Sequence, residues 1–381
     1  MLYEIHMLKN YPPTNLNRDD TGSPKTCLFG GVNRGRISSQ CLKRSWRTSD
    51  IFRQAVGEEN LGIRTRMLPS LVVEKLLEMG VSPAYADMVL PKISGFGNKD
   101  GTESKKGNAT QQVIFFCPQD IQAAADAVKK LLDGCKTEKD VKALKAKDLQ
   151  AAVEGAKDRA VTLDIALFGR MVTSDAFRDV EASMQVAHAI STNKVAVESD
   201  YFTAMDDMLR GETSDDSGAA MIGDIDYNSS CYYIYAALDT DILKKNLESI
   251  PDADTLIAKA IPALLRAMAF TNPSGKQNSF AGHVLPSAVL VECKHTKIPT
   301  SLVNAYVEPV RGGKDLLESS IAQLAEESNV MSRNYGLEVD KRLWFCVDKY
   351  SVTPPEGAVI CKTFPAVSYT HLRAHETLAN L

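Results

Sequence analysis

The chain has 381 residues, 44% of them hydrophobic and 24% charged, and its formal net charge is −4 at pH 7. These values predict a globular protein with two or three compact units and exclude one that is coated in positive charge. The eight cysteines show no C-x-x-C pair and no histidine at zinc spacing, so we expect reduced cysteines in a cytoplasmic protein without a metal site. No apolar run approaches the ~18 residues of a membrane span, and the charged first residues are unlike a signal peptide.

The N-terminal region predicts a strand, a loop and a helix in that order. Residues 2–9 alternate between apolar and other side chains, which predicts a strand with one buried face that ends at Pro12 and Pro13. Residues 15–31 are rich in Asn, Asp, Gly and Pro and predict a loop. Ser38 or Ser39 is a suitable N-cap for a helix that runs toward Ser49.

The same region holds the most basic stretch of the chain. Residues 33–48 carry five cations and no acid: Arg34, Arg36, Lys43, Arg44 and Arg47. On the expected helix, Leu42 and Trp46 would anchor one face in the core, while Gln40, Lys43 and Arg47 line another, with Arg44 beside them. Such a run is either a solvated basic face or a surface that follows phosphates. Arg18 and Lys25 upstream, and glycines that let backbone approach a ligand, favour the second interpretation.

Residues 51–164 are predicted to be mainly helical. Segments 68–79, 83–90 and 120–132 are amphipathic, and Thr137-x-x-Asp140 resembles a capping box. Between them, 94–110 predicts a flexible loop whose lysines either touch nucleic acid or are only solvated, and 111–116 predicts a short strand.

The second half predicts a return to a main sheet. Residues 162–171 are expected to return to that sheet and residues 183–190 to form a helix. On this helix we interpret His188 as a histidine with its hydrogen bonds satisfied; the alternative is a catalytic role. Further predicted elements are strands 231–238, 287–293 and 343–347 and helices over 256–268 and 317–331. Strands and helices that alternate around an insertion indicate an α+β protein with a ferredoxin-like or RRM-type sheet.

Eight short motifs point to a family. They are L-N-R-D-D at 16–20, F-G-G at 29–31, R-I-S-S-Q at 36–40, L-K-R at 42–44, G-R-M at 169–171, A-H-A-I at 187–190, Y-F-T-A-M-D-D at 201–207 and G-K-Q at 275–277. In this order they resemble the CRISPR type I-E Cascade backbone subunit, the CasC family. The resemblance extends over nearly the whole chain, to about Pro365.

The resemblance implies a layout of three parts. An RRM-like palm would comprise 1–50, 165–198 and 231–365, a helical fingers insertion 51–164, and a thumb hairpin 199–230. The tail 366–381 departs from the family pattern and is excluded from functional reasoning, and we do not interpret His371 and His375 as a metal pair.

We expect the palm to bind single-stranded RNA without sequence preference, which needs cations along the backbone and flat or soft side chains against bases. The cations are Arg18, Lys25, Arg36, Lys43, Arg44, Arg47 and Lys276, with Ser38 and Gln40 as hydrogen-bonding groups. The resemblance implies that Met171, Phe202 and Thr203 flank a displaced base. For Met171 and Phe202 the alternative is plain core packing.

The segment after Phe202 is acidic, with seven acids and one arginine at positions 206–226. Phosphates would repel such a hairpin, so we expect it to act sterically and to dock on a neighbouring copy's basic surface.

The sequence shows no G-x-S-x-G, H-E-x-x-H, Walker or dinucleotide-binding motif. Asp19 and Asp20 are the one place where chemistry could occur, as a metal-dependent endoribonuclease site, or they only cap turns. The resemblance implies a non-catalytic subunit without a cofactor. Copies would stack along guide RNA, contact other Cascade subunits and present bases for pairing with target DNA. The remaining alternative is a structural filament protein without direct RNA contact.

Overall fold

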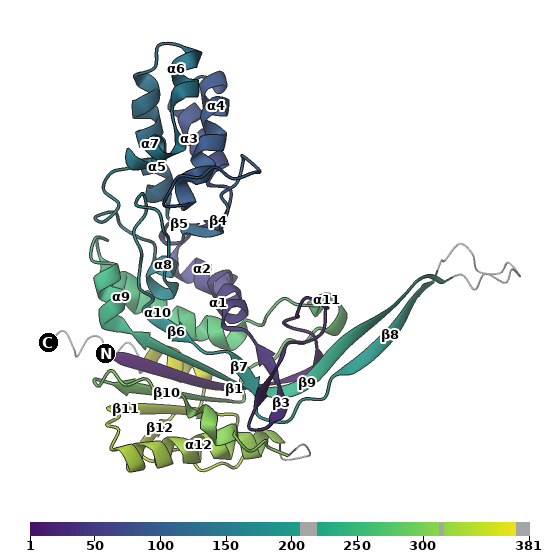
Figure 1. Cartoon of the computed structure of the whole chain (residues 1–381). Coiled ribbons are helices and arrows are strands. Elements are labelled where there is room, and N and C mark those ends of the chain that lie inside the picture. Colours follow the sequence, from purple (N-terminus) through teal and green to yellow (C-terminus); the bar gives the residue numbers. More distant parts are fainter. Residues whose placement is uncertain (206–218, 312–315, 371–381) are drawn as a thin grey trace, which may run out of the picture. The chain divides into compact units, whose positions relative to one another are not determined.

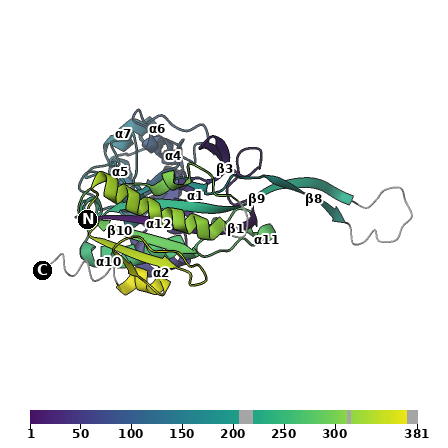
Figure 2. The same cartoon turned by 90° about the horizontal axis from the view of Figure 1, so that it is seen from below.

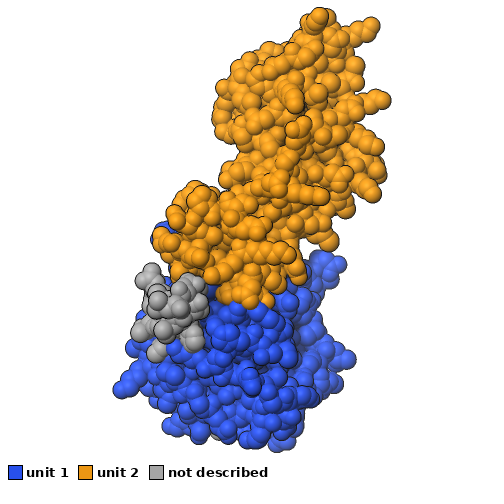
Figure 3. Space-filling view, turned by 90° about the vertical axis from the view of Figure 1, so that its left-hand side faces the viewer, with its two compact units in different colours: residues 1–55, 185–238, 260–381 blue, residues 56–184, 239–259 orange. Residues whose placement is uncertain are grey.

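A computed structural model of the chain describes residues 1–205, 219–311 and 316–370. The chain forms two compact units (Figure 3): unit 1 comprises residues 1–55, 185–238 and 260–381, and unit 2 comprises 56–184 and 239–259. Most of the expected fingers segment falls in unit 2, which also takes in 165–184 and 239–259. The boundaries expected for palm, fingers and thumb stay predictions, and the tail from 371 lies outside the described residues.

A large, mainly antiparallel sheet forms the centre of unit 1 (Figure 1). The main path runs β12-β11-β10-β1-β9-β7-β3-β2, while β6 and β8 pair with β9. The strand bounds are β1 Leu2–Thr14, β2 Thr26–Phe29, β3 Val32–Ile37, β6 Met184–Val186, β7 Ala189–Ser191, β8 Glu198–Met205, β9 Ala219–Asp239, β10 Ala288–Lys294, β11 Lys341–Cys346 and β12 Ala358–Ile360.

Strand β1 is buried on both faces and includes Pro12 and Pro13, so the prediction of a shorter strand with one buried face is wrong. Its polar side chains are tolerated in the interior because they have partners. The hydroxyl of Tyr235 donates to Glu4 at 2.5 Å, and the ring Nδ1 of His6 lies 2.8 Å from the hydroxyl of Tyr233.

Helices cover both faces of this sheet (Figures 1 and 2). Helix α12 lies on one face, where Ile321 and Leu324 pack in one cluster with Leu8, Leu290 and Trp344. The predicted inward face of this helix is thereby confirmed. The helices that belong wholly or partly to unit 1 have these bounds: α1 Ser39–Arg47, α2 Asp50–Val56, α10 Ala253–Phe270, α11 Gln277–Phe280, α12 Leu316–Tyr335, the 3-10 helix η3 Leu302–Tyr306 and the short π-helix η4 Ala366–Thr370.

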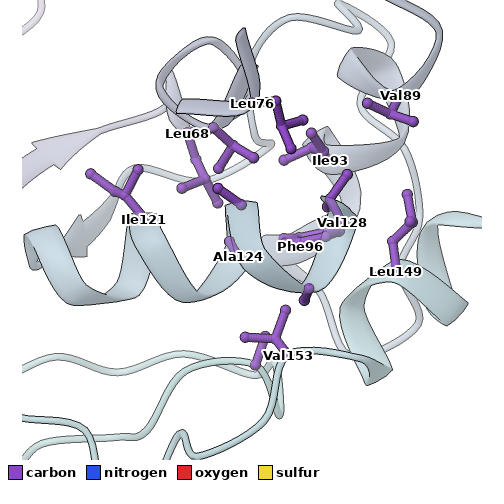
Figure 4. Packing of buried hydrophobic residues seen from close by; sticks show 14 of the residues in the cluster. Leu68, Leu76, Val89, Ile93, Phe96, Ile121, Ala124, Val128, Leu149 and Val153 are labelled. Carbon is purple, nitrogen blue, oxygen red and sulfur yellow. The ribbon is translucent and has the colours of Figure 1, made fainter. Parts of the chain in front are cut away.

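Unit 2 is mainly helical, with a small sheet of β4 (Ile63–Thr65) and β5 (Ile114–Phe116). Figure 4 shows its core, in which Leu68 and Leu76 pack with Ile121 and Val128. The remaining bounds are η1 Glu58–Asn60, α3 Leu68–Glu78, α4 Pro83–Ile93, η2 Ser94–Gly97, α5 Pro118–Asp133, α6 Glu138–Ala143, α7 Ala146–Ala151, α8 Leu163–Phe168 and α9 Thr240–Asn246. The predicted capping box is confirmed, because Thr137 and Asp140 each accept a hydrogen bond from the other's backbone N–H.

The prediction of a helix over residues 183–190 is wrong. This segment forms the short strands β6 and β7, and His188 lies between them. Pairing with β9 satisfies its backbone, since the N–H of Ala187 donates to the carbonyl of Tyr235 at 3.0 Å and Ile190 pairs with Tyr233. Long-range pairing of this kind overrides a weak local helix preference.

Strands β8 and β9 form a hairpin that projects from the sheet of unit 1 (Figures 1 and 2). Glu198 pairs with Tyr227 at its base, and Phe202 pairs with Gly223 further out. Most of the acids predicted in the thumb, at 206–218, lie outside the described residues.

Within the described ranges, no helix combines the length and the apolar character needed to cross a membrane.

Candidate nucleic-acid interface

Helix α1 is fixed at its start by two hydrogen bonds. The Ser38 hydroxyl accepts from the N–H of Cys41 at 3.3 Å, and the N–H of Ser38 donates to the side-chain oxygen of Asn17 at 2.8 Å. Leu42 and Trp46 are buried. The predicted cap and the predicted core face of this helix are therefore confirmed, and the basic side chains are left on its other faces.

A groove of about 700 Å³ lies beside α1. One wall is the loop 16–22, the second is the face of α1 that carries Cys41, Arg44, Ser45 and Thr48, and the third is the loop 271–275. These segments come from distant parts of the chain, and all belong to unit 1.

Loop 16–22 is held in shape by its own polar groups. The carboxylate of Asp19 accepts from the N–H of Thr21 at 3.0 Å, the hydroxyl of Thr21 at 2.8 Å and the N–H of Ser23 at 3.0 Å. These bonds, that from the Thr21 hydroxyl above all, hold the pKa of Asp19 below its usual range. The Asn15 amide donates to the carbonyls of Gly22 and Asp226, at 2.9 and 2.8 Å, and so ties the loop to the hairpin base.

Asp19 and Asp20 both line the groove. One oxygen of Asp19 accepts all three loop hydrogen bonds, as a turn-capping aspartate does, while Asp20 is exposed. Over the ranges that the structure describes, no group of three or more His, Cys, Asp or Glu side chains could hold a metal ion.

Loop 271–275 packs closely on loop 16–22. A Cβ at Gly275 would lie 2.3 Å from the carbonyl oxygen of Leu16, so only glycine fits there. The next residue, Lys276, has a left-handed backbone with φ of 51°. The Gln277 amide closes the loop by donating to the carbonyl of Pro273 at 2.9 Å.

The structure places the predicted cations in two groups. Arg18 and Arg44 line the groove. Lys43 and Arg47, with Gln40, lie on the adjoining face of α1, and Lys276 follows the third wall. Burial lowers the pKa of Lys43.

Arg36 and Lys25 form the second group, with His188. The Arg36 guanidinium lies 3.1 Å from Nδ1 of His188 and donates to the carbonyl of Thr26 at 3.2 Å. Partial burial and the charges of Arg36 and Lys25 lower the pKa of His188. His188 is exposed beside Arg36, which is a predicted RNA contact, and it does not lie on a helix as the sequence predicted.

Arg34 belongs to the basic run in sequence but not to this surface. It is buried and donates to five backbone carbonyls: Phe29, Ser191, Thr192, Tyr306 and Val307. Its guanidinium therefore joins three segments of unit 1 and has a structural role.

Met171, Phe202 and Thr203 are placed differently from one another. Met171, in unit 2, is 91% exposed, which excludes core packing within the chain. Phe202 is half-buried, and its ring lies so close to Gly223 that a Cβ there would be 2.7 Å from it. Thr203 is exposed and, as the next residue in β8, faces the opposite side of the hairpin. Phe202 and Thr203 therefore do not share a face.

The sequence did not reveal Cys41, Thr271 and Asn272 as groove residues. Their position depends on contacts between segments about 230 residues apart in the chain, and the only local signal was the turn-forming N-P-S-G motif at 272–275.

Comparison with known proteins decides the family. The family model described as CT1975-like protein matches residues 3–366. The chain belongs to this family. The expected kinship of this CT1975-like protein with Cascade backbone subunits is confirmed.

Solved structures agree with this assignment. One similar chain comes from a structure titled "CRISPR RNA-guided surveillance complex, pre-nicking", with 25% identity, a TM-score of 0.78, and coverage of 99% of this chain and 100% of that chain. Another, titled "CRISPR RNA-guided surveillance complex", has 21% identity, a TM-score of 0.61 and coverage of 98% and 99%, and supports the fold alone. No curated protein matches the chain.

Proposed function

We propose that this CT1975-like protein is a backbone subunit of a CRISPR RNA-guided surveillance complex (Cascade) and that its groove binds guide RNA. The observation that carries the proposal is the basic face of α1 together with the adjoining groove, which Arg18 and Arg44 line beside Asp19 and Asp20. In a chain with net charge −4, such a concentration of cations suits a local polyanion site.

RNA would be held by its backbone, independently of sequence. Arg and Lys contact phosphates, and the exposed Gln40 side chain suits phosphate or the 2′-hydroxyl. The Ser38 hydroxyl is buried and caps α1, so its expected contact with RNA would need RNA to reach the start of the helix. Met171, Phe202 and Thr203 supply apolar or small side chains against bases. Because Phe202 and Thr203 face opposite sides of β8, we assign only Phe202 to stacking and Thr203 to the other face of the hairpin.

The fold supports the palm, fingers and thumb layout. The order β1–α1–β7–β9–α10–β10 follows the β-α-β-β-α-β sequence of ferredoxin-like and RRM sheets. Unit 2 would be the fingers and the β8–β9 hairpin the thumb. Copies would stack head to tail in the cytoplasm, with other Cascade subunits at the ends, and base pairing with target DNA would supply specificity.

Three labelled single-stranded RNAs of unrelated sequence and equal length test this function. The purified full chain should bind all three with dissociation constants within roughly threefold, because backbone contacts carry no sequence information. A preference of a hundredfold for one of them would contradict backbone recognition. Failure to bind any RNA would favour the structural filament protein without direct RNA contact.

We also propose that the subunit does not cut RNA, because Asp19 is engaged in capping its own loop. Incubation with RNA and Mg²⁺ should leave the RNA intact, in the wild type and in Asp19→Ala/Asp20→Ala alike. Regular cleavage products that disappear in the double variant would establish the endoribonuclease alternative.

A further inference from the structure

Lys9 is a buried cation that the RNA contacts above do not include. Its side chain, on β1, is 1% exposed. The ammonium donates to the carbonyl of Thr271 at 3.0 Å and to the side-chain oxygen of Asn272 at 3.4 Å. In the described part of the chain no carboxylate forms an ion pair with it. An ammonium without a counter-charge is costly to bury, and burial lowers the pKa of Lys9 to about 7.

The two acceptors of this ammonium are themselves walls of the groove, since Thr271 and Asn272 both line it. The side-chain oxygen of Asn272 also accepts from the hydroxyl of Tyr11 at 2.7 Å. Lys9 and Tyr11, which are both buried, thus support the third wall of the groove through hydrogen bonds from the protein interior. The Lys9 ammonium therefore contacts two residues of the wall that would face RNA phosphates.

The groups around Lys9 leave its charge uncompensated. The Tyr11 and Tyr232 rings, 5.8 Å apart, are neutral at pH 7 because burial raises the pKa of each hydroxyl, and burial likewise raises the pKa of the Cys41 thiol. The charged groups that line the groove in front of the wall are Arg18, Arg44, Asp19 and Asp20, and Lys276 and His283 flank α11.

We propose that Lys9 is a positioning residue of the groove whose ammonium is charged when phosphate occupies the groove, so that RNA binding takes up a proton. The inference rests on the proposed RNA function and adds a pH-dependent regulation to it. An anion placed near a partly deprotonated lysine favours the charged form, since the two attract through a region of low dielectric.

The sign of the effect follows from linkage. At pH 6 the free protein largely carries the proton, and RNA binds at nearly full affinity. As the pH rises above 7, the free protein loses the proton and binding must restore it, so the affinity falls. One proton limits the loss of affinity between pH 7 and 8.5 to about thirtyfold, and a partial rise in the pKa of Lys9 on binding gives RNA binding that is roughly three- to tenfold weaker at pH 8.5 than at pH 6.0.

The experiment measures the dissociation constant of a labelled single-stranded RNA from pH 6.0 to 8.5 at fixed ionic strength. It compares the full-length wild type with Lys9→Met, which keeps the length and apolar stem of the side chain but cannot titrate. His188→Gln is the matched control, because His188 also titrates and lies beside Arg36. Circular dichroism and thermal melts confirm that each variant is folded.

The expected result is a pH dependence that Lys9→Met abolishes and His188→Gln retains. The same dependence in Lys9→Met as in the wild type, or no dependence in the wild type, would overturn the proposal. Should Lys9→Met fail to fold, Asn272→Asp replaces it: a carboxylate beside the ammonium keeps Lys9 charged, so the pH dependence should flatten, and an unchanged one would overturn the proposal.

The two proposals fail in different ways. RNA binding that is strong but independent of Lys9 refutes only the role of Lys9. Absence of binding at every pH refutes the RNA function and the Lys9 proposal with it.

Discussion

Phe202 is half-buried because its ring lies against Gly223 on the neighbouring strand of the hairpin. A residue in this position can stack on a base without belonging to a core. We predict that Phe202→Ala loses roughly 1–3 kcal/mol of RNA affinity, the usual worth of an aromatic–base contact. The melting temperature should change little, since Phe202 is only half-buried in a hairpin that projects from the sheet of unit 1. RNA titrations and thermal melts of the variant measure the two effects.

Tyr201→Ala is the control for this prediction. Tyr201 is 65% exposed and, one residue earlier in β8, faces the opposite side of the hairpin. It should therefore change RNA affinity by much less than Phe202→Ala. A loss of about 3–5 kcal/mol of folding stability in Phe202→Ala, with RNA affinity intact, would show that Phe202 is a core residue instead.

A buried ion cluster connects α5 to the segment that carries Met171. The Asp120 carboxylate binds Arg159 at 2.9 Å and Arg170 at 2.5 Å and accepts from the Cys117 thiol at 2.9 Å. Burial opposes the charge of Asp120, but Arg170 and the bonds from Cys117 outweigh burial and lower its pKa. Since Arg170 directly precedes Met171, the cluster fixes the base of an exposed side chain.

We predict that Asp120→Asn destabilises unit 2 by roughly 3–5 kcal/mol, because it leaves buried guanidinium groups without a counter-charge. The difference from the wild type should be present at pH 7. It should shrink as the pH falls below about 3.9, where the unfolded chain takes up the proton and the wild type loses the stabilisation of its depressed pKa. Urea unfolding at several pH values measures it.

Asp133→Asn, on the same helix, is the matched control. Asp133 is 62% exposed and pairs with Lys129 at 2.6 Å, so its loss should cost under about 1 kcal/mol. Equal effects of the two variants would contradict a special role for the buried cluster.

Elements with strong local signals could be predicted from the sequence. Helix α1 has the predicted cap and core face because Ser38, Leu42 and Trp46 act within one short segment, and the same holds for the capping box at Thr137. Segment 183–190 could not be predicted, because its pairing with β9 decides its conformation. Arg34 shows the same limit at the site. Its sequence position is in a basic run, but it is buried and donates to the carbonyl of Phe29 and to four carbonyls from distant segments.

The molecule as a whole is proposed to assemble along RNA, and the hairpin offers a test. Thr203 pairs with Ile222, so replacing residues 204–221 by Asn-Gly would close the hairpin with a two-residue turn and leave the sheet of unit 1 intact. We predict a folded chain, with a melting temperature within a few degrees of the wild type, that still binds short RNA weakly but no longer assembles on long RNA.

Analytical ultracentrifugation with RNAs of increasing length measures this assembly. A replacement of 204–221 by Gly-Ser repeats of equal length serves as the control for chain length, and it should also fail to assemble. Normal assembly of the shortened variant would remove the hairpin from the interface between copies.

The salt dependence of RNA binding tests whether the basic face of α1 and its groove neutralise RNA phosphates. For single strands, log K falls with log salt by about 0.7 per neutralised phosphate, so replacing Lys43, Arg44 and Arg47 by Ala should flatten the slope by roughly 2 and weaken binding to every sequence. The control triple variant replaces three cations that do not line the groove: Arg333, Lys349 and Lys362. A control slope equal to the wild type, beside a flattened slope for the α1 variant, is the predicted result. A folded α1 variant with the wild-type slope would show that this face does not neutralise RNA phosphates.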